Sequence, residues 1–315
     1  MASKSRETAP RGSVAGVLVT FEPDLDRFTE CVSRVMAQVD ALVVVDNGPT
    51  DVVLDGIEVI RPGCNVGLAA AQNRGIAWAR EHGHSHVLLL DQDSWPETGM
   101  VTALRAADPG GRAAAVGPRH YDPRTNAHAP FIRVRFPMSR KIDAVTGTVR
   151  CDFLISSGSL IPLAVLDDVG EMDEGLFIDN VDLDWCFRAA DRGYELYGVA
   201  SALMEHPIGD RRSRVGLAQV AQHPPVRLYF IMRNRIALYR RRHTPLTWIA
   251  QDIPRVVVKL LTFGVFIGPR RANVSHMLRG IHDGLRGVLG PAPYGATSVR
   301  PRQVPPAADS VTKYE

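Results

Sequence analysis

Two carboxylates, Asp91 and Asp93, flank Gln92 directly after HVLLLD (86–91), the most apolar run among the expected strands. A strand ending there would bring both carboxylates to one edge of a sheet. Carboxylate oxygens are ligands that Mg²⁺ and Mn²⁺ take together with diphosphate oxygens. His206 follows another expected strand, and its imidazole could complete such a ligand set. The common alternatives are a solvated turn for the two acids and a structural role for the histidine.

A second group of acids lies in GLFIDNVDLDWCFRA (175–189). Asp179, Asp182 and Asp184 surround an expected helix start, where capping and the helix dipole account for at least one of them. Asp179 and Asp182 are three residues apart and would share one face of the helix. A carboxylate held there could remove the proton of an attacking hydroxyl group.

The elements that must position these residues alternate between short apolar runs and helical stretches. The apolar runs predict strands at 14–21, 41–46, 57–61 and 86–91. Helical spacing predicts helices at 25–38 and 68–81. This alternation predicts an α/β fold with a mostly parallel central sheet flanked by helices. Ligands bind such sheets at the carboxyl ends of the strands, and three of these ends carry Thr20-Phe21, Asp46-Asn47 and Asp91-Gln92-Asp93.

The remaining regions differ in composition. The segment 118–150 is mixed in Pro, Arg and Thr and predicts loops or short antiparallel strands. After Pro224-Pro225 the chain becomes helical and basic, through 226–243 and 244–268. We therefore predict a disordered leader (1–13), a catalytic domain (14–223), a C-terminal helical region (224–290) and a disordered tail (291–315).

Composition and charge exclude several classes of protein. The chain has 315 residues, 45% of them hydrophobic, which excludes wholesale disorder. The net charge of +3, from 37 basic and 34 acidic residues, gives no indication of nucleic-acid binding. Four scattered cysteines without a CxxC pair indicate neither a disulfide framework nor a Cys-based zinc site, so a reducing cytoplasm fits best.

The C-terminal region combines positive charge with an apolar stretch. Arginines cluster at 211–212, 240–242 and 270–271, and the apolar stretch 256–268 is too short to cross a bilayer. A solvated basic face is one interpretation. The other is an interfacial helical hairpin that meets an anionic membrane surface, which would place the protein peripherally on the inner face of the plasma membrane.

Several motifs occur in a fixed order: VTFEPD (19–24), VVVDNG (43–48), NVGLAAAQNRGI (65–76), LLLDQDS (88–94), SSGSLI (156–161), FIDNVDLDWCFRA (177–189), MEHPIGD (204–210) and RLYFIMRNR (227–235). This ordered set resembles the family-2 inverting glycosyltransferases of the GT-A fold. Within that family it is most similar to the bacterial rhamnosyltransferases that use dTDP-L-rhamnose. The resemblance covers residues 14–242.

The resemblance implies roles for individual residues. The nucleotide-sugar donor would be bound by Thr20, Phe21, Glu22, Asp46, Asn65, Gly67, Asn73, Arg74, Asp91, Gln92, Asp93, Gly158 and Ser159. Mg²⁺ or Mn²⁺ would be held by Asp91, Asp93 and His206, with Asp93 the more direct ligand. An RN pair, Arg233 and Asn234, would contact phosphate or the acceptor.

One departure from the family pattern concerns the general base. Many relatives have Glu-Asp where this chain has Asp179-Asn180, and an amide cannot accept the proton. Either Asp179 takes that role, which we slightly favour, or Asp182 reaches the acceptor. The carboxylate would deprotonate the acceptor hydroxyl as it attacks the anomeric carbon, and the metal would stabilise the leaving diphosphate.

The acceptor implied is a hydroxyl of a cell-surface polysaccharide or a lipid-linked glycan, with no nucleic acid as partner. Two alternatives stay open. One is a family-2 transferase that uses a UDP-sugar, galactofuranose or a hexose. The other is a non-catalytic nucleotide-sugar binding module. A dinucleotide-binding enzyme is disfavoured because no GxGxxG follows the first strand.

Overall fold

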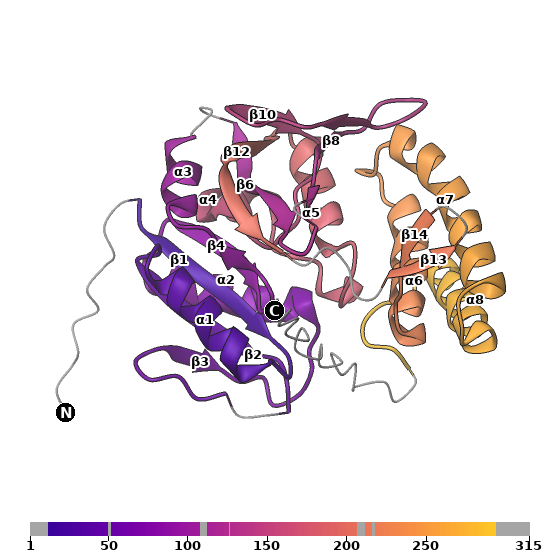
Figure 1. Cartoon of the computed structure of the whole chain (residues 1–315), viewed down its shortest axis with the longest axis horizontal. Helices are drawn as coiled ribbons and strands as arrows, with labels where there is room; N and C mark the ends of the chain where they lie inside the picture. The colour runs from indigo at the N-terminus through magenta and orange to yellow at the C-terminus, as the bar shows by residue number, and fades with distance from the viewer. Residues whose placement is uncertain are drawn as a thin grey trace, which may run out of the picture.

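A ten-stranded mixed sheet forms the centre of the protein (Figure 1). The computed structural model describes residues 12–49, 52–107, 112–125, 127–206, 212–215 and 218–293, so most of the predicted leader and tail lies outside the described residues. Strand β1 (Val14–Thr20) lies between β2 (Ala41–Asp46) and β4 (His86–Asp91), and β3 (Glu58–Ile60) pairs with β2. All four are parallel, as the apolar runs predict.

The second half of the sheet is mixed. Strand β11 (Leu160–Pro162) runs antiparallel between β4 and β6 (Ala113–Asp122), and β6 is parallel to β12 (Glu195–Glu205). Shorter strands complete it: β5 (Trp95–Pro96), β7 (Ala127–His128) and β10 (Thr148–Cys151). Two small sheets stand apart, β8 (Phe131–Arg133) with β9 (Arg140–Ile142), and β13 (Arg212–Val215) with β14 (Ala218–Ala221). The short antiparallel strands expected in 118–150 are present, but β6, which runs into this segment, was not predicted.

Helices cover both faces of the sheet because strand residues alternate in direction. Val14 and Leu18 of β1 pack in a core with α1 (Leu25–Met36) and α3 (Met100–Ala106). Ala15 and Val17 pack in a second core with α2 (Leu68–Glu81), α4 (Leu163–Val169) and α5 (Val181–Asp191). The fold is the expected α/β architecture of GT-A type.

Three helices, α6 (Pro225–Tyr239), α7 (Leu246–Val265) and α8 (Arg270–Arg286), form the C-terminal region. They share an apolar core of their own and lie at one side of the sheet (Figure 1). The contact between α6 and α8 is close: a Cβ on Gly280 would lie 2.3 Å from the carbonyl oxygen of Tyr229. Within the described part of the chain, no helix is both long and apolar enough to cross a membrane.

The close approach of α6 and α8 predicts that a methyl group added at Gly280 destabilises the protein. Gly280→Ala should lower the free energy of unfolding by about 1–3 kcal/mol, because α6 and α8 must separate. Gly264→Ala is the matched control, since a Cβ there meets Val274 at 3.1 Å and Ala favours a helix over Gly by about 1 kcal/mol. Urea unfolding of both variants measures the difference. Equal stability would contradict the tight packing of the two helices.

Candidate active site

The carboxyl ends of β1, β2 and β4 meet at one edge of the sheet. Thr20 is opposite Asp46, and Val19 is opposite Asp91. Gln92 connects two of these ends, because its Oε1 accepts hydrogen bonds from Thr20 Oγ1 (2.8 Å) and from the Phe21 backbone N–H (2.6 Å). Thr20 and Gln92 thus fix the rim of the site.

Asp46 and Asn65 organise the neighbouring loops. The Asp46 carboxylate is buried and accepts backbone N–H groups of Gly48 (3.2 Å) and Val52 (3.0 Å). Asn65 Oδ1 accepts from Asn47 Nδ2 and from the Gly67 N–H, both at 3.0 Å. These contacts hold the segments in which a nucleoside is expected. Phe21 and Glu22, at the end of β1, are only partly exposed.

Three carboxylates gather where β4 meets the first turn of α5. Burial, together with the charges of Asp93 and Asp182, raises the pKa of Asp91 to about 7, against a lowering by Arg227. Burial also raises the pKa of Asp182 to about 6, with a further contribution from Asp179 and an opposing hydrogen bond from the Leu183 N–H. Carboxylates that destabilise one another's charge in this way are suited to a divalent cation.

The protein ligands for such an ion are fewer than predicted. Within the described residues, no three His, Cys, Asp or Glu side chains are arranged to hold a metal together, so the set of Asp91, Asp93 and His206 is not preformed. Mg²⁺ is commonly bound by one or two carboxylates plus substrate phosphates. The half-buried Asp91 and the exposed Asp93 fit that pattern.

A chain of hydrogen bonds connects Asp91 to His206. The Asp91 N–H donates to Ser157 Oγ (2.9 Å), Ser157 Oγ to Ser94 Oγ (2.9 Å), and Ser94 Oγ is 2.7 Å from His206 Nδ1. Both serines are fully buried. Neither Ser94 nor Ser157 was among the predicted site residues, although Ser94 directly follows Asp93. The Nδ1 of His206 is therefore connected through two serines to the backbone of Asp91.

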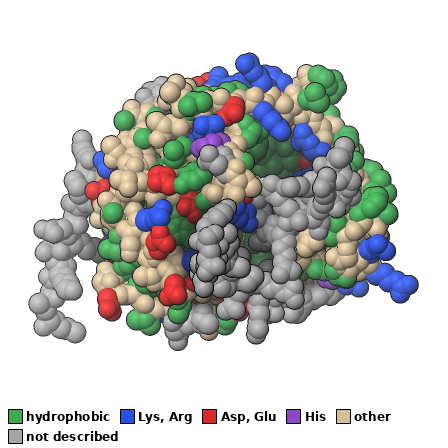
Figure 2. Space-filling view, viewed as in Figure 1, with side chains coloured by type: hydrophobic (Ala, Val, Ile, Leu, Met, Phe, Trp, Pro, Cys, Tyr) green, Lys and Arg blue, Asp and Glu red, His purple; other side chains and the backbone are tan. Residues whose placement is uncertain are grey.

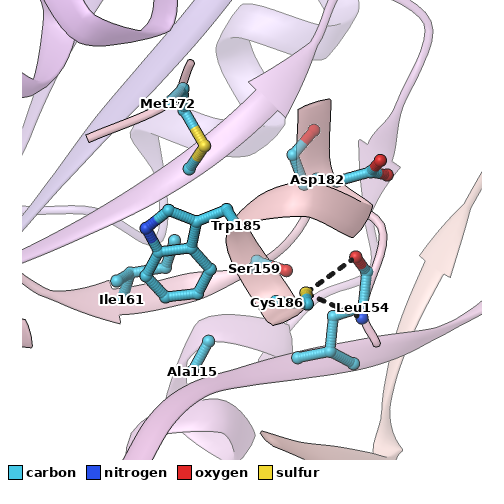
Figure 3. Close-up of a pocket in the computed structure, with 9 residues that line it drawn as sticks. Ala115, Leu154, Ser159, Ile161, Met172, Asp182, Trp185 and Cys186 are labelled. Carbon is cyan, nitrogen blue, oxygen red and sulfur yellow. Dashed lines mark hydrogen bonds between the residues drawn. The ribbon is translucent and has the colours of Figure 1, made fainter. Parts of the chain in front are cut away.

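Gly158 and Ser159 pack the floor of the site. Gly158 has φ +88°, and a Cβ there would lie 2.5 Å from Pro118. Ser159 Oγ donates to the Ile155 carbonyl at 2.6 Å. Figure 3 shows Asp182 in the first turn of α5, with Trp185 and Cys186 on the same helix and Ser159 beside them. Ser159 and Asp182 thus line the same pocket.

Asp179 lies near enough to Asp182 for its charge to raise the pKa of Asp182, and it forms an ion pair with Arg227. Arg227 Nη2 and Nε lie 3.2–3.3 Å from its carboxylate oxygens. Asp179 and Asn180 both have φ above +60°, a conformation that is strained for residues other than glycine. Arg227 was not among the predicted site residues, and its position in the first turn of α6 brings it to Asp179.

The predicted phosphate or acceptor contacts of Arg233 and Asn234 are wrong. Both side chains are fully buried in α6. Asn234 Nδ2 is 2.7–2.9 Å from the carbonyl oxygens of Leu176, Ile178 and Asp179. Arg233 donates to the carbonyl groups of Gly175, Leu176 and Gly290. Backbone carbonyls thus take the donors that a phosphate would need, and the pair positions the segment that carries Asp179.

The start of α2 is also unavailable to phosphate. The Phe177 carbonyl accepts the Leu68 N–H at 2.7 Å, and a Cβ on Gly67 would lie 2.6 Å from the Phe177 ring. Asn73 is buried and exchanges hydrogen bonds with the Met172 backbone (2.9 and 3.0 Å). Gly67 and Asn73 therefore serve packing in this structure, whereas Arg74 is exposed.

Asp184, two residues after Asp182, has the opposite environment. Burial raises its pKa, but the hydrogen bond from His243 (2.8 Å) and the charges of Arg241 and Arg188 outweigh this and lower it to about 2. Asp184 joins α5 to the end of α6. Asp184 is thus a charged, ion-paired residue of the fold, whereas burial raises the pKa of Asp182.

The contacts of Asn234 predict a local effect. Asn234→Ala should accelerate amide hydrogen exchange in 175–180, because the carbonyl groups of Ile178 and Asp179 lose the Asn234 donor and that of Leu176 keeps only Arg233. Asn273→Ala is the matched control, since that buried side chain donates to the Ile267 carbonyl, away from the site. Exchange measured by mass spectrometry should change in 175–180 only for Asn234→Ala. Equal exchange there in both variants would contradict the positioning role.

Comparisons with known proteins agree with this geometry. The model of the family described as glycosyl transferase family 2 matches residues 17–170. The chain is 30% identical to the dTDP-rhamnosyl transferase RfbF of Shigella flexneri over 296 residues, 90% of this chain and 99% of RfbF.

Two solved structures share the fold. S. aureus TarS (1–349) in complex with UDP-GlcNAc has a TM-score of 0.56 at 15% identity, over 88% of this chain and 81% of TarS. GalNAc-T7 with UDP, GalNAc and Mn²⁺ has a TM-score of 0.54 at 13% identity, over 88% of this chain and 56% of that chain. With the strand-end carboxylates and the coverage by RfbF, these findings lead to one conclusion: the chain belongs to glycosyltransferase family 2.

Proposed function

We propose that the protein transfers L-rhamnose from dTDP-L-rhamnose, with inversion, to a hydroxyl group of a cell-surface polysaccharide or a lipid-linked glycan. The observation that carries the chemistry is the meeting of Asp182, whose pKa is raised to about 6, with the strand-end acids Asp91 and Asp93. The choice of donor rests on the similarity to RfbF. We place the reaction in the cytoplasm, at the inner face of the plasma membrane.

We propose Asp182 as the general base rather than Asp179. A base works best when its pKa approaches the operating pH, which favours Asp182. The Asp179 carboxylate is already engaged by Arg227. Asp182 would take the proton of the acceptor hydroxyl as the acceptor oxygen bonds to the anomeric carbon. The anomeric carbon–oxygen bond then breaks, and its electron pair leaves with the nucleoside diphosphate.

Negative charge on that leaving group needs stabilisation. Asp91 and Asp93 would hold Mg²⁺ or Mn²⁺, which as a Lewis acid neutralises charge on the diphosphate. Arg227 lies close enough to lower the pKa of Asp91, so its guanidinium would face the same phosphates. Thr20, Gln92 and Asp46 keep the nucleoside side of the site in shape.

The donor and the ion are tested together. Incubation with Mg²⁺ or Mn²⁺ and a panel of nucleotide sugars should release nucleoside diphosphate fastest from dTDP-L-rhamnose. EDTA and Asp93→Ala should each abolish release, because a ligand or the ion itself is lost. Preference for a UDP-sugar would replace the proposed donor. Binding without release from any donor would favour a non-catalytic module, and full turnover in EDTA would exclude the metal.

The base is tested by two matched variants. Asp182→Asn should lower kcat by roughly 10²–10⁴-fold, whereas Asp179→Asn should keep most of it. In the wild type, kcat should fall as the pH drops through about 6, because Asp182 must be unprotonated to accept the proton. The pH profile should be the same in Asp179→Asn. Full activity of Asp182→Asn, together with loss of activity in Asp179→Asn, would assign the base to Asp179.

A further inference from the structure

Helix α7 presents an apolar stripe on the side facing away from its core. Its inner face buries Trp248, Val256 and Phe263. The outer stripe is formed by Ile253, Val257, Leu261 and Val265, each about half exposed or more, and Leu246 and Val258 widen it. Residues four apart lie on one side of a helix, so this stripe is continuous.

The loop between β8 and β9 extends the same surface. Phe136 and Met138 are 69% and 78% exposed there. The loop is fixed beside α7: Ser139 N and Oγ donate to Gln251 Oε1 (3.1 and 2.7 Å), and Gln251 Nε2 donates to the Arg135 carbonyl (2.7 Å). Figure 1 shows the β8 region reaching towards α7. Two segments more than a hundred residues apart in sequence thus lie side by side, and each carries exposed apolar side chains.

The charges around this surface are mostly basic, and the exposed Asp143, which follows β9, pairs with Arg119. Between residues 246 and 289 the sequence contains two acids, Asp252 and Asp283. Both are turned inward, Asp252 to Arg235 and Tyr239, and Asp283 to Tyr229. The exposed cations of the described helices α7 and α8 are Arg255, Arg270, Arg271, Arg279 and Arg286, and those of the loop and β9 are Arg135, Arg140 and Lys141. Figure 2 shows green apolar and blue basic side chains over α7 and α8 at the right edge.

We propose that the outer face of α7 and the β8–β9 loop together form a docking surface for an anionic lipid bilayer. Exposed apolar side chains among cations are suited to insertion between acyl chains with the arginines at the lipid phosphates. A second copy of the chain fits poorly, because a two-fold interface would bring the same cations together. This inference rests on the proposed function, because docking would bring the enzyme to a membrane that presents a lipid-linked acceptor.

Co-sedimentation of the full chain with vesicles tests this surface. Phosphatidylcholine vesicles with and without phosphatidylglycerol are compared at low and high salt. Wild type should bind the anionic vesicles and release them at high salt, since screening weakens the arginine contacts. Leu261→Glu and the double variant Phe136→Ser/Met138→Ser should each bind at least about tenfold more weakly. Leu25→Glu is the matched control, because Leu25 is 64% exposed on α1 and Leu261 58% exposed.

The outcomes separate the alternatives. Equal binding of Leu261→Glu and Leu25→Glu, or no binding by wild type, would overturn the proposal. A dimer found by analytical ultracentrifugation and lost in Leu261→Glu would assign the surface to a second copy instead. Nucleoside diphosphate release measured without vesicles distinguishes failure of the docking proposal from failure of the proposed function. Variants that lose lipid binding but keep this release leave the proposed function intact, whereas wild type that binds lipid without releasing nucleoside diphosphate contradicts the proposed function alone.

Discussion

The buried pair Arg233 and Asn234 is the interaction on which the site depends. Their side chains hold the backbone carbonyl groups from Gly175 to Asp179. In that segment, Phe177, Asp179 and Asn180 adopt left-handed conformations, which cost about 1–3 kcal/mol each. The carbonyl of Phe177 in turn satisfies the first N–H of α2. One polar pair in a C-terminal helix therefore determines the conformation of the loop that carries Asp179 and leads into α5.

Two aspartates of α5, Asp182 and Asp184, have different environments although they are the same residue type on the same helix. Asp182 and Asp184 are two residues apart on α5, yet their pKa values are shifted in opposite directions. Asp184 has cationic partners within the fold and stabilises it. Asp182 faces other carboxylates, so its charge is left for substrates to compensate. The C-terminal region contributes Arg241, after α6, to the environment of Asp184, and Arg227 of α6 pairs with Asp179.

The sequence predicted the parallel strands and the acids at their ends because apolar runs and turn positions are local signals. Residues such as Asp91 and Asp182 could be named for the same reason. The orientation of Arg233 could not be predicted, since its partner carbonyls lie 57 or more residues away and have no sequence signature. The pairing of β6 with β12 is equally non-local. The residues around Ser94 and Ser157 in the sequence form no pattern that indicates a hydrogen-bond chain, so only the three-dimensional contacts reveal their role.

The contact of Gly290 has a consequence for how the enzyme matures. Its N–H donates to the Gly175 carbonyl at 2.7 Å, and its own carbonyl accepts from Arg233. During synthesis, domains fold as the chain emerges, N-terminal parts first. The sheet and its acids emerge long before residue 290, but the loop that carries Asp179 gains its last hydrogen-bonding partners only when that residue has left the ribosome. The loop that carries Asp179 is thus completed only after residue 290 has emerged, and a nascent chain that stops earlier holds the carboxylates without these contacts.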